Sequence, residues 1–174
     1  MSLQVVGRDG SLLDVTKDGR VRTSNHNREM FSWTLVTYNM AAADTILGLR
    51  NISSTKGLHI TKVAVSADVA GIVDFHVVNG SAALAGTLIT GVSMNGPKAT
   101  TADADARGDE TTNTTQGSVI LTLEIPAAGA AGPIGVWDFE GDLVLGLNQM
   151  LGIDMAQEAA TCQASIFGYF EPIE

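Results

Sequence analysis

The chain is poor in cysteine, proline, aromatic residues and charge. Cys162 is the only cysteine among 174 residues, so no intramolecular disulfide can stabilise the fold. Cys162 alternates in phase with Ala164 and Ile166, which predicts a small buried core residue rather than a reactive thiol. This cysteine usage is compatible with assembly in a reducing cytoplasm.

Long hydrophobic runs are also missing. Every apolar run is broken by Gly, Asp or Thr well before eighteen residues, so we expect no membrane span. The start, MSLQVVGRDG, lacks a basic region followed by an apolar one, so we expect no secretory signal. Apolar residues make up 45% of the chain and charged residues 17%, which excludes general disorder and leaves few charges to cover a monomer. A burying partner is therefore expected.

The charge is acidic overall and unevenly distributed. A net charge of −9 argues against a nucleic-acid binder, which would present a basic face to phosphates. Residues 1–28 hold five basic and three acidic side chains, a net charge of +2. Residues 29–174 hold five basic and sixteen acidic side chains, a net charge of −11. The sequence therefore divides into a basic N-terminal arm, residues 1–28, and an acidic body, residues 29–174.

The body shows the alternation of half-buried strands. Between Gly117 and Pro126 the sequence SVILTLEI places one set of apolar residues on one face and polar residues on the other, with Ile120 as an exception. The expected inward residues are Val119, Leu121, Leu123 and Ile125. About nine such short strands, separated by Gly, Ser, Asn and Asp turns, predict an all-β fold: an antiparallel β-sandwich of the jelly-roll type.

One strand changes phase along its length. Leu58 and Ile60 share one face, whereas Val63 and Val65 share the other. This strand either carries a bulge near Thr61-Lys62 or is covered on both faces, and the sequence leaves both alternatives open.

The N-terminal arm contains a short repeat. Asp9-Gly10-Ser11-Leu12 recurs nine residues later as Asp18-Gly19-Arg20-Val21, and each Asp-Gly suits a tight hairpin turn. The following segments, LLDVT and RVRTS, are expected to be short strands. The predicted β-hairpin arm has too few large apolar residues for a core, so it should lie on another surface. A frayed terminus is the alternative.

The last strand carries two aromatic residues on its outward face. Thr161 to Phe170 places Phe167 and Tyr169 opposite Cys162 and Ile166. Outward aromatics favour contact with a neighbouring subunit or chain segment, and a second sheet layer is the alternative. We therefore take Phe167 and Tyr169 as candidate subunit-interface residues.

No pattern indicates catalysis, a metal or a cofactor. The histidines His26, His59 and His76 are scattered, without the spacing that presents two ligands to a metal or the His-any-His cluster of cupin metalloenzymes. A nucleophile elbow and a phosphate-binding glycine loop are both missing. We expect a protein that is not an enzyme, without a metal or cofactor, although a site assembled from distant strands would escape this reading.

The stretch from Asn95 to Gln116 is rich in Thr, Ala and Asp and has no large apolar residue. Its length predicts a disordered or functional loop, which within an oligomer could reach a neighbour. The carboxylates between Asp103 and Glu110 suit calcium, but Arg107 stands where an oxygen donor is needed. The tripeptide Arg107-Gly108-Asp109 is too short to carry integrin binding. A solvated loop is the better interpretation of these residues.

The order of several segments resembles a family of virion proteins. These segments are the Asp-Gly arm, Asn-Ile-Ser-Ser-Thr-Lys-Gly-Leu-His-Ile, Ser-Ala-Asp-Val, Val-Asn-Gly and Ser-Ile-Phe-Gly-Tyr-Phe-Glu. Together they resemble the jelly-roll capsid decoration, or cement, proteins of tailed bacteriophages, over most of Asp9 to Glu171. The resemblance implies a homotrimer on the outer surface of an icosahedral capsid, made in the host cytoplasm and bound to the major capsid protein.

The expected function is therefore a non-enzymatic virion structural protein that decorates and stabilises the capsid. The alternative is a receptor- or glycan-binding module of a tail fibre or spike, for which only Trp33, Trp137, Tyr38 and Tyr169 are available, with both tryptophans in core phase. We expect the arm to dock on the capsid. Its basic residues are attracted either to an acidic shell or to the acidic body of an adjacent subunit. The candidate docking residues are Arg8, Lys17, Arg20 and Arg22.

Overall fold

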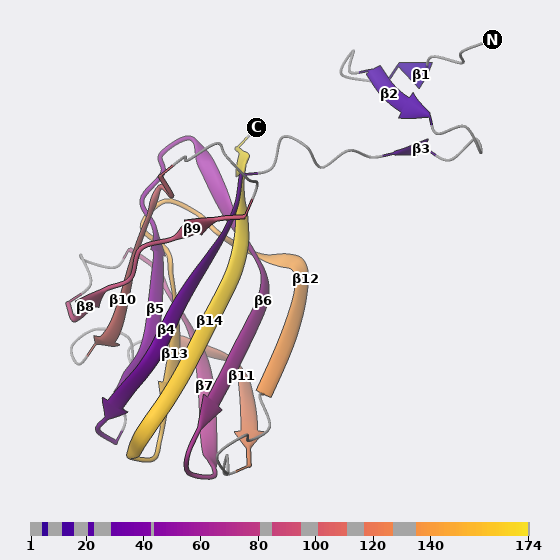
Figure 1. Cartoon of the computed structure of the whole chain (residues 1–174). Helices are drawn as coiled ribbons and strands as arrows, with labels where there is room; N and C mark the ends of the chain where they lie inside the picture. Colours follow the sequence, from indigo (N-terminus) through magenta and orange to yellow (C-terminus); the bar gives the residue numbers. More distant parts are fainter. Residues whose placement is uncertain are drawn as a thin grey trace.

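The structure is a computed structural model of the chain. It describes residues 5–6, 12–15, 21–22, 29–42, 44–80, 85–94, 101–110, 117–126 and 135–173. Within these residues all regular structure is β-strand and every strand pair is antiparallel, as Figure 1 shows. The described residues contain no helix long and apolar enough to cross a membrane.

The first sheet of the body has the strand order β11-β7-β13-β5-β10-β8. Its strands are β5 (Thr45–Asn51), β7 (Gly71–Val78), β8 (Thr87–Leu88), β10 (Ala104–Glu110), β11 (Ser118–Ile125) and β13 (Met150–Met155).

The second sheet has the order β12-β6-β14-β4-β9. Its strands are β4 (Glu29–Met40), β6 (Lys56–Ala67), β9 (Val92–Ser93), β12 (Gly135–Leu145) and β14 (Ala159–Pro172). The predicted all-β, antiparallel β-sandwich is confirmed.

The core lies between the inner faces of the two sheets. Phe31 and Trp33 from β4 and Phe75 from β7 are fully buried, together with aliphatic residues from both sheets. Cys162 is buried among them, as its phase predicts. Each fully buried large apolar side chain contributes about 1.5–3 kcal/mol relative to an exposed one, so this shared layer holds the sheets together.

Strand pairing in the body is nested. The strand β4 pairs with β14, β5 with β13, β6 with β12, and β7 with β11. The chain therefore resembles one long hairpin, rolled so that alternate pairs enter opposite sheets. This order is compatible with the predicted jelly-roll type.

The phase change in β6 is a β-bulge. Phe167 pairs with Lys62 and the next residue, Gly168, pairs with Ile60, which leaves Thr61 as the extra residue. The Thr61 hydroxyl donates a hydrogen bond to the carbonyl of Phe167 at 3.1 Å. Leu58 and Ile60 before the bulge and Val63 and Val65 after it consequently all face the core, which decides between the two sequence-based alternatives.

The strand β10 corrects the prediction of a solvated loop between Asp103 and Glu110. It pairs with β5 along most of its length and with β8 on its other side. Ala106 and Gly108 face the core, and a Cβ added at Gly108 would lie 2.8 Å from Leu35 Cδ1. This strand lacks large apolar residues because its inner face has no room for them. Residues 95–100 and 111–116 of the same predicted loop lie outside the described part of the chain.

The strand predicted between Gly117 and Pro126 is present, but at an edge of its sheet. Leu121, Leu123 and Ile125 face inward, whereas Val119 is exposed because the register shifts between Val119 and Leu121. The inward prediction was therefore wrong for Val119. Trp137 was also expected in the core. It lies in β12, at a sheet edge, and its side chain is only partly buried.

The arm contains a separate three-stranded sheet in the order β1-β2-β3. Its strands are β1 (Val5–Val6), β2 (Leu12–Val15) and β3 (Val21–Arg22), and they pair antiparallel. The predicted strands LLDVT and RVRTS are thus present in part, with one more strand before them. Both Asp-Gly turns lie outside the described residues. We call this sheet the N-terminal ribbon.

Candidate interaction surfaces

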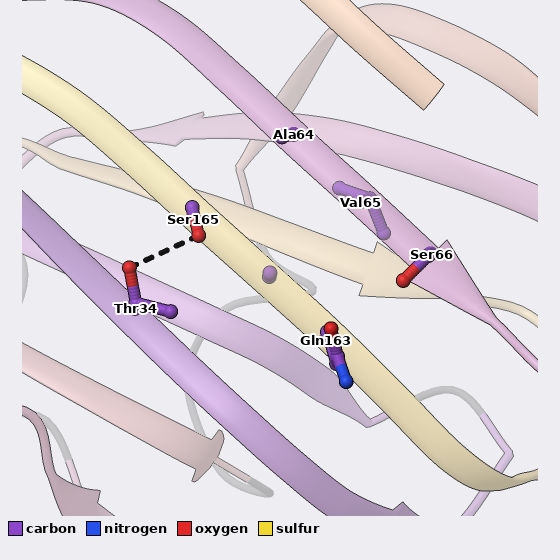
Figure 2. Close-up of a pocket in the computed structure, with 7 residues that line it drawn as sticks. Thr34, Ala64, Val65, Ser66, Gln163 and Ser165 are labelled. Atoms are coloured by element: carbon purple, nitrogen blue, oxygen red, sulfur yellow. Dashed lines mark hydrogen bonds between the residues drawn. The ribbon is translucent and has the colours of Figure 1, made fainter. Parts of the chain in front are cut away.

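The outer face of the second sheet is a flat surface of small polar residues. Figure 2 shows side chains from three neighbouring strands on this face, with Thr34 and Ser165 joined by a hydrogen bond of 3.0 Å between their hydroxyl oxygens. They line a shallow hollow of about 70 Å³, which is too small for an organic ligand of ordinary size. The lining residues on the outer face include Thr34, Ala64, Ser66, Gln163 and Ser165.

A wider apolar groove lies on the same sheet. Its volume is about 370 Å³, and Met30, Met94 and Phe167 supply its apolar wall. Lys62 and Asp138 lie at its polar side, with Lys62 Nζ 3.7 Å from Asp138 Oδ2. Phe167 therefore lines a surface groove, where its side chain can contact another molecule.

Tyr169 is covered by its own chain. Only 7% of it is exposed, and its ring stacks on His59 with centroids 4.8 Å apart. A Cβ added at Gly141, in the bend of β12, would lie 3.0 Å from the Tyr169 hydroxyl, so this bend closes over the ring. Of the two outward aromatics, Phe167 offers more surface to a partner.

His59 and His76 have the same arrangement of partners. His59 places Nδ1 3.1 Å from the carbonyl oxygen of Gly141 and Nε2 3.4 Å from Glu171 Oε2. His76 places Nδ1 3.3 Å from the carbonyl oxygen of Gly117 and Nε2 3.1 Å from Asp154 Oδ2. Each histidine thus ties its strand to a distant segment.

The partners of His76 form a buried polar row on the outer face of the first sheet. Asp154 also accepts a hydrogen bond from the Thr45 hydroxyl, and all three residues are buried. No described nucleophilic side chain contacts His76, so the row does not form a nucleophile, base and carboxylate triad. Its observed contacts are structural.

Among the carboxylates between Asp103 and Glu110, Asp105 is engaged with two arginines, and Asp103 Oδ2 lies 3.9 Å from Lys56 Nζ. Arg107 Nε donates to Asp105 Oδ1 at 2.8 Å, and Arg50 Nη2 lies 3.8 Å from Asp105 Oδ2. The Arg107-Gly108-Asp109 tripeptide lies within β10 rather than at a loop tip. Among the described residues no group of three histidine, cysteine, aspartate or glutamate side chains can hold a metal ion.

The predicted docking residues belong to the N-terminal ribbon and the segments around it. Arg22 lies in β3, paired in register with Asp14 of β2. Arg8, Lys17 and Arg20 lie outside the described residues. The ribbon forms its own sheet and shares no strand pair with the sandwich in the described part of the chain.

One apolar surface was missed by the sequence analysis. The strands β11 and β12 each end one sheet, on the same side of the sandwich, and besides Val144 of β12 they together expose four large apolar side chains. The exposed fractions are 50% for Val119, 44% for Ile120, 53% for Val136 and 39% for Trp137. We call these four residues with their two strands the β11–β12 edge. The mixed phase of VILTL and the exception at Ile120 were the only sequence signals for it.

No protein-family model matches this chain, and neither the curated proteins nor the solved structures contain a match.

Proposed function

We propose that this protein is a non-enzymatic structural protein of a bacteriophage virion. In this proposal it binds the assembled major capsid protein on the outer surface of the capsid, decorates the shell and stabilises it. The subunits act as a homotrimer, with Phe167 at a subunit interface and Tyr169 beside it. The basic residues of the arm, Arg8, Lys17, Arg20 and Arg22, supply the contacts to the shell.

The observation that carries this proposal is the division of the chain into a rigid sandwich and a separate ribbon. The sandwich buries a complete core from residues 31 to 170. The ribbon has strands of two to four residues, which is too little for an independently stable core. A segment of this kind gains order by binding, which suits attachment to a repeated lattice, where many weak contacts combine.

The surfaces of the described residues also favour binding over catalysis. The two hollows described above are open to the surface, and His59 and His76 are paired with Glu171 and Asp154 in structural contacts. A glycan-binding module would present an aromatic platform. Trp33 is fully buried and Tyr169 nearly so, which leaves Trp137 as the one partly exposed tryptophan of the described chain. These exposures favour decoration over glycan binding.

The number of copies per particle tests the proposal. Purified virions would be analysed by quantitative mass spectrometry against the major capsid protein. Decoration predicts hundreds of copies per virion, because a lattice offers that many equivalent positions. A handful of copies would instead support a tail fibre or spike.

Deletion of the arm tests the attachment segment. Removing Met1 to Ser24 leaves all core residues in place, so the urea unfolding midpoint of the sandwich should stay within the error of the full-length value. Attachment to undecorated particles, measured by co-sedimentation, should be lost. Because exposed ion pairs contribute only about 0–1 kcal/mol each and are screened by salt, charge reversal of Arg20 alone should weaken attachment without abolishing it. Wild-type occupancy by the truncated protein would show that attachment uses the body.

A further inference from the structure

The β11–β12 edge is a pair of long strand edges. Exposed strand edges pair readily with other chains, and proteins usually blunt them with lysine, proline, inward charges or very short strands. Here β11 and β12 span eight and eleven residues, and residues 118–125 and 135–145 contain neither lysine nor proline. Each strand has one irregularity, a register shift at Ile120 in β11 and a longer one between Asp138 and Leu143 in β12.

The opposite side of the sandwich is built differently. There the sheets end in β8 and β9, which are only two residues long each. Such short edge strands offer few backbone groups to another chain. The two sides of the sandwich therefore differ in the length of their edge strands. Both expose apolar side chains, since Leu88 in β8 and Val92 in β9 are 60% and 63% exposed.

The chemistry of the edge specifies a basic partner. Residues 117–145 contain four carboxylates and no lysine or arginine. Among the described side chains Glu124, Asp138 and Glu140 are exposed there, and only Asp138 has a nearby lysine. A matching strand would alternate apolar residues with basic ones. The segment Arg20-Val21-Arg22 has this pattern, and it belongs to the +2 arm of an otherwise acidic chain.

The ribbon of the same chain can reach this edge only with the connecting segment almost fully extended, which disfavours a contact within one chain. The body begins at Glu29, which pairs with Phe170, whereas Trp137 pairs near the other end of β6, at Val63. Crossing three strands and running about five residues along them requires roughly 20–25 Å. The segment 23–28 spans about 25 Å only when fully extended.

We propose that the N-terminal ribbon of one copy docks on the β11–β12 edge of a second copy. The contact covers Val119, Ile120, Val136 and Trp137, adds backbone hydrogen bonds at the strand edge and brings the basic arm beside the carboxylates of residues 117–145. Repeated around a closed ring, each copy gives one ribbon and receives one. This contact does not depend on a capsid, which separates it from the proposed function.

Disulfide trapping between two differently tagged full-length chains tests the contact. Cys162 is buried and is replaced by alanine in both chains, so that the introduced cysteines are the only thiols. One chain carries Val21→Cys in the ribbon and the other carries Val119→Cys in the edge. The matched control replaces Val119→Cys with Gln163→Cys, which is exposed on the outer face of the second sheet.

Docking predicts that the mixed disulfide between ribbon and edge forms on the order of a hundredfold faster than the control disulfide at micromolar protein, because docking raises the effective thiol concentration. Adding Val136→Lys to the edge chain should remove this excess while its unfolding midpoint stays unchanged. Equal rates for edge and control would overturn the proposal. So would a disulfide confined to single chains when Val21→Cys and Val119→Cys are combined in one polypeptide, since that places the ribbon on its own edge.

Discussion

At the scale of single residues, the two described histidines differ in burial rather than in partners. Each places one ring nitrogen at a glycine carbonyl and the other at a carboxylate. Asp154, the partner of His76, is buried with Thr45, whereas Glu171, the partner of His59, is partly exposed. A buried carboxylate that loses one of its partners regains the part of its desolvation penalty that this partner offset.

Replacement of His76 should therefore cost more than replacement of His59. We expect His76→Ala to lower the free energy of unfolding by about 1–3 kcal/mol or more, because Asp154 loses a partner in a buried site. His59→Ala should cost less, since water can reach Glu171. Urea denaturation of both variants measures the difference. Equal losses would show that burial of the carboxylate does not govern the effect.

Two glycines with positive φ form a second matched pair. Gly141 has φ +87° and Gly80 has φ +66°, so alanine is strained at both positions by about 1–2 kcal/mol. A Cβ at Gly80 meets nothing within 4 Å, whereas a Cβ at Gly141 meets the Tyr169 hydroxyl. Gly141→Ala should therefore destabilise the protein more than Gly80→Ala in urea. A reversed order would mean that the bend of β12 moves freely off Tyr169.

At the scale of strands, position within the sheet predicts local stability. The strand β14 lies between β6 and β4, and β13 lies between β7 and β5, so both are paired on two sides. We expect the slowest amide hydrogen exchange in β13 and β14, because their opening approaches global unfolding. The strands β8 and β9 should exchange fastest among the body strands. Exchange measured by mass spectrometry on proteolytic peptides checks this order, and uniform protection would contradict it.

The strands that sequence predicted well are those with large alternating apolar residues. The strand β4 is predicted directly by the alternation of Phe31, Trp33 and Leu35, because a sandwich strand buries every second residue. The polar strand β10 was missed, since its inner Ala106 and Gly108 are small to fit against Leu35, and only the folded structure reveals that neighbour.

The position of each strand within its sheet could not be predicted from the sequence either. Trp137 has the phase of a core residue, and it packs edge-on against Phe139 with ring centroids 6.4 Å apart. It remains 39% exposed because β12 ends its sheet. Alternation along one strand predicts which face of the sheet a side chain lies on. Whether a neighbouring strand covers that side chain depends on the strand order, which is set by pairings between distant segments. The edge surface therefore appeared only with the fold.

At the scale of the whole molecule, the trimer prediction rests on the low charge of the chain and on its exposed apolar surface. Only 17% of the residues are charged, and the β11–β12 edge and the Met30, Met94 and Phe167 groove remain open in a single copy. We expect a trimer at micromolar concentration, because closed cyclic symmetry buries such surfaces. Light scattering coupled to size-exclusion chromatography gives the mass directly. A monodisperse monomer would contradict the trimer.

The nested pairing of strands also has a consequence for biosynthesis. The strand β4 is the first of the sandwich to leave the ribosome, and it cannot pair with β14 until that last strand has emerged. The strands β5, β6 and β7 pair with β13, β12 and β11, so β7, the last of the three to be made, is the first whose partner emerges. A nascent chain therefore cannot close its sheets until residues 159–172 have emerged, and a polypeptide released before that point lacks the central strand of its second sheet. The second sheet is therefore completed only after β14 has been translated.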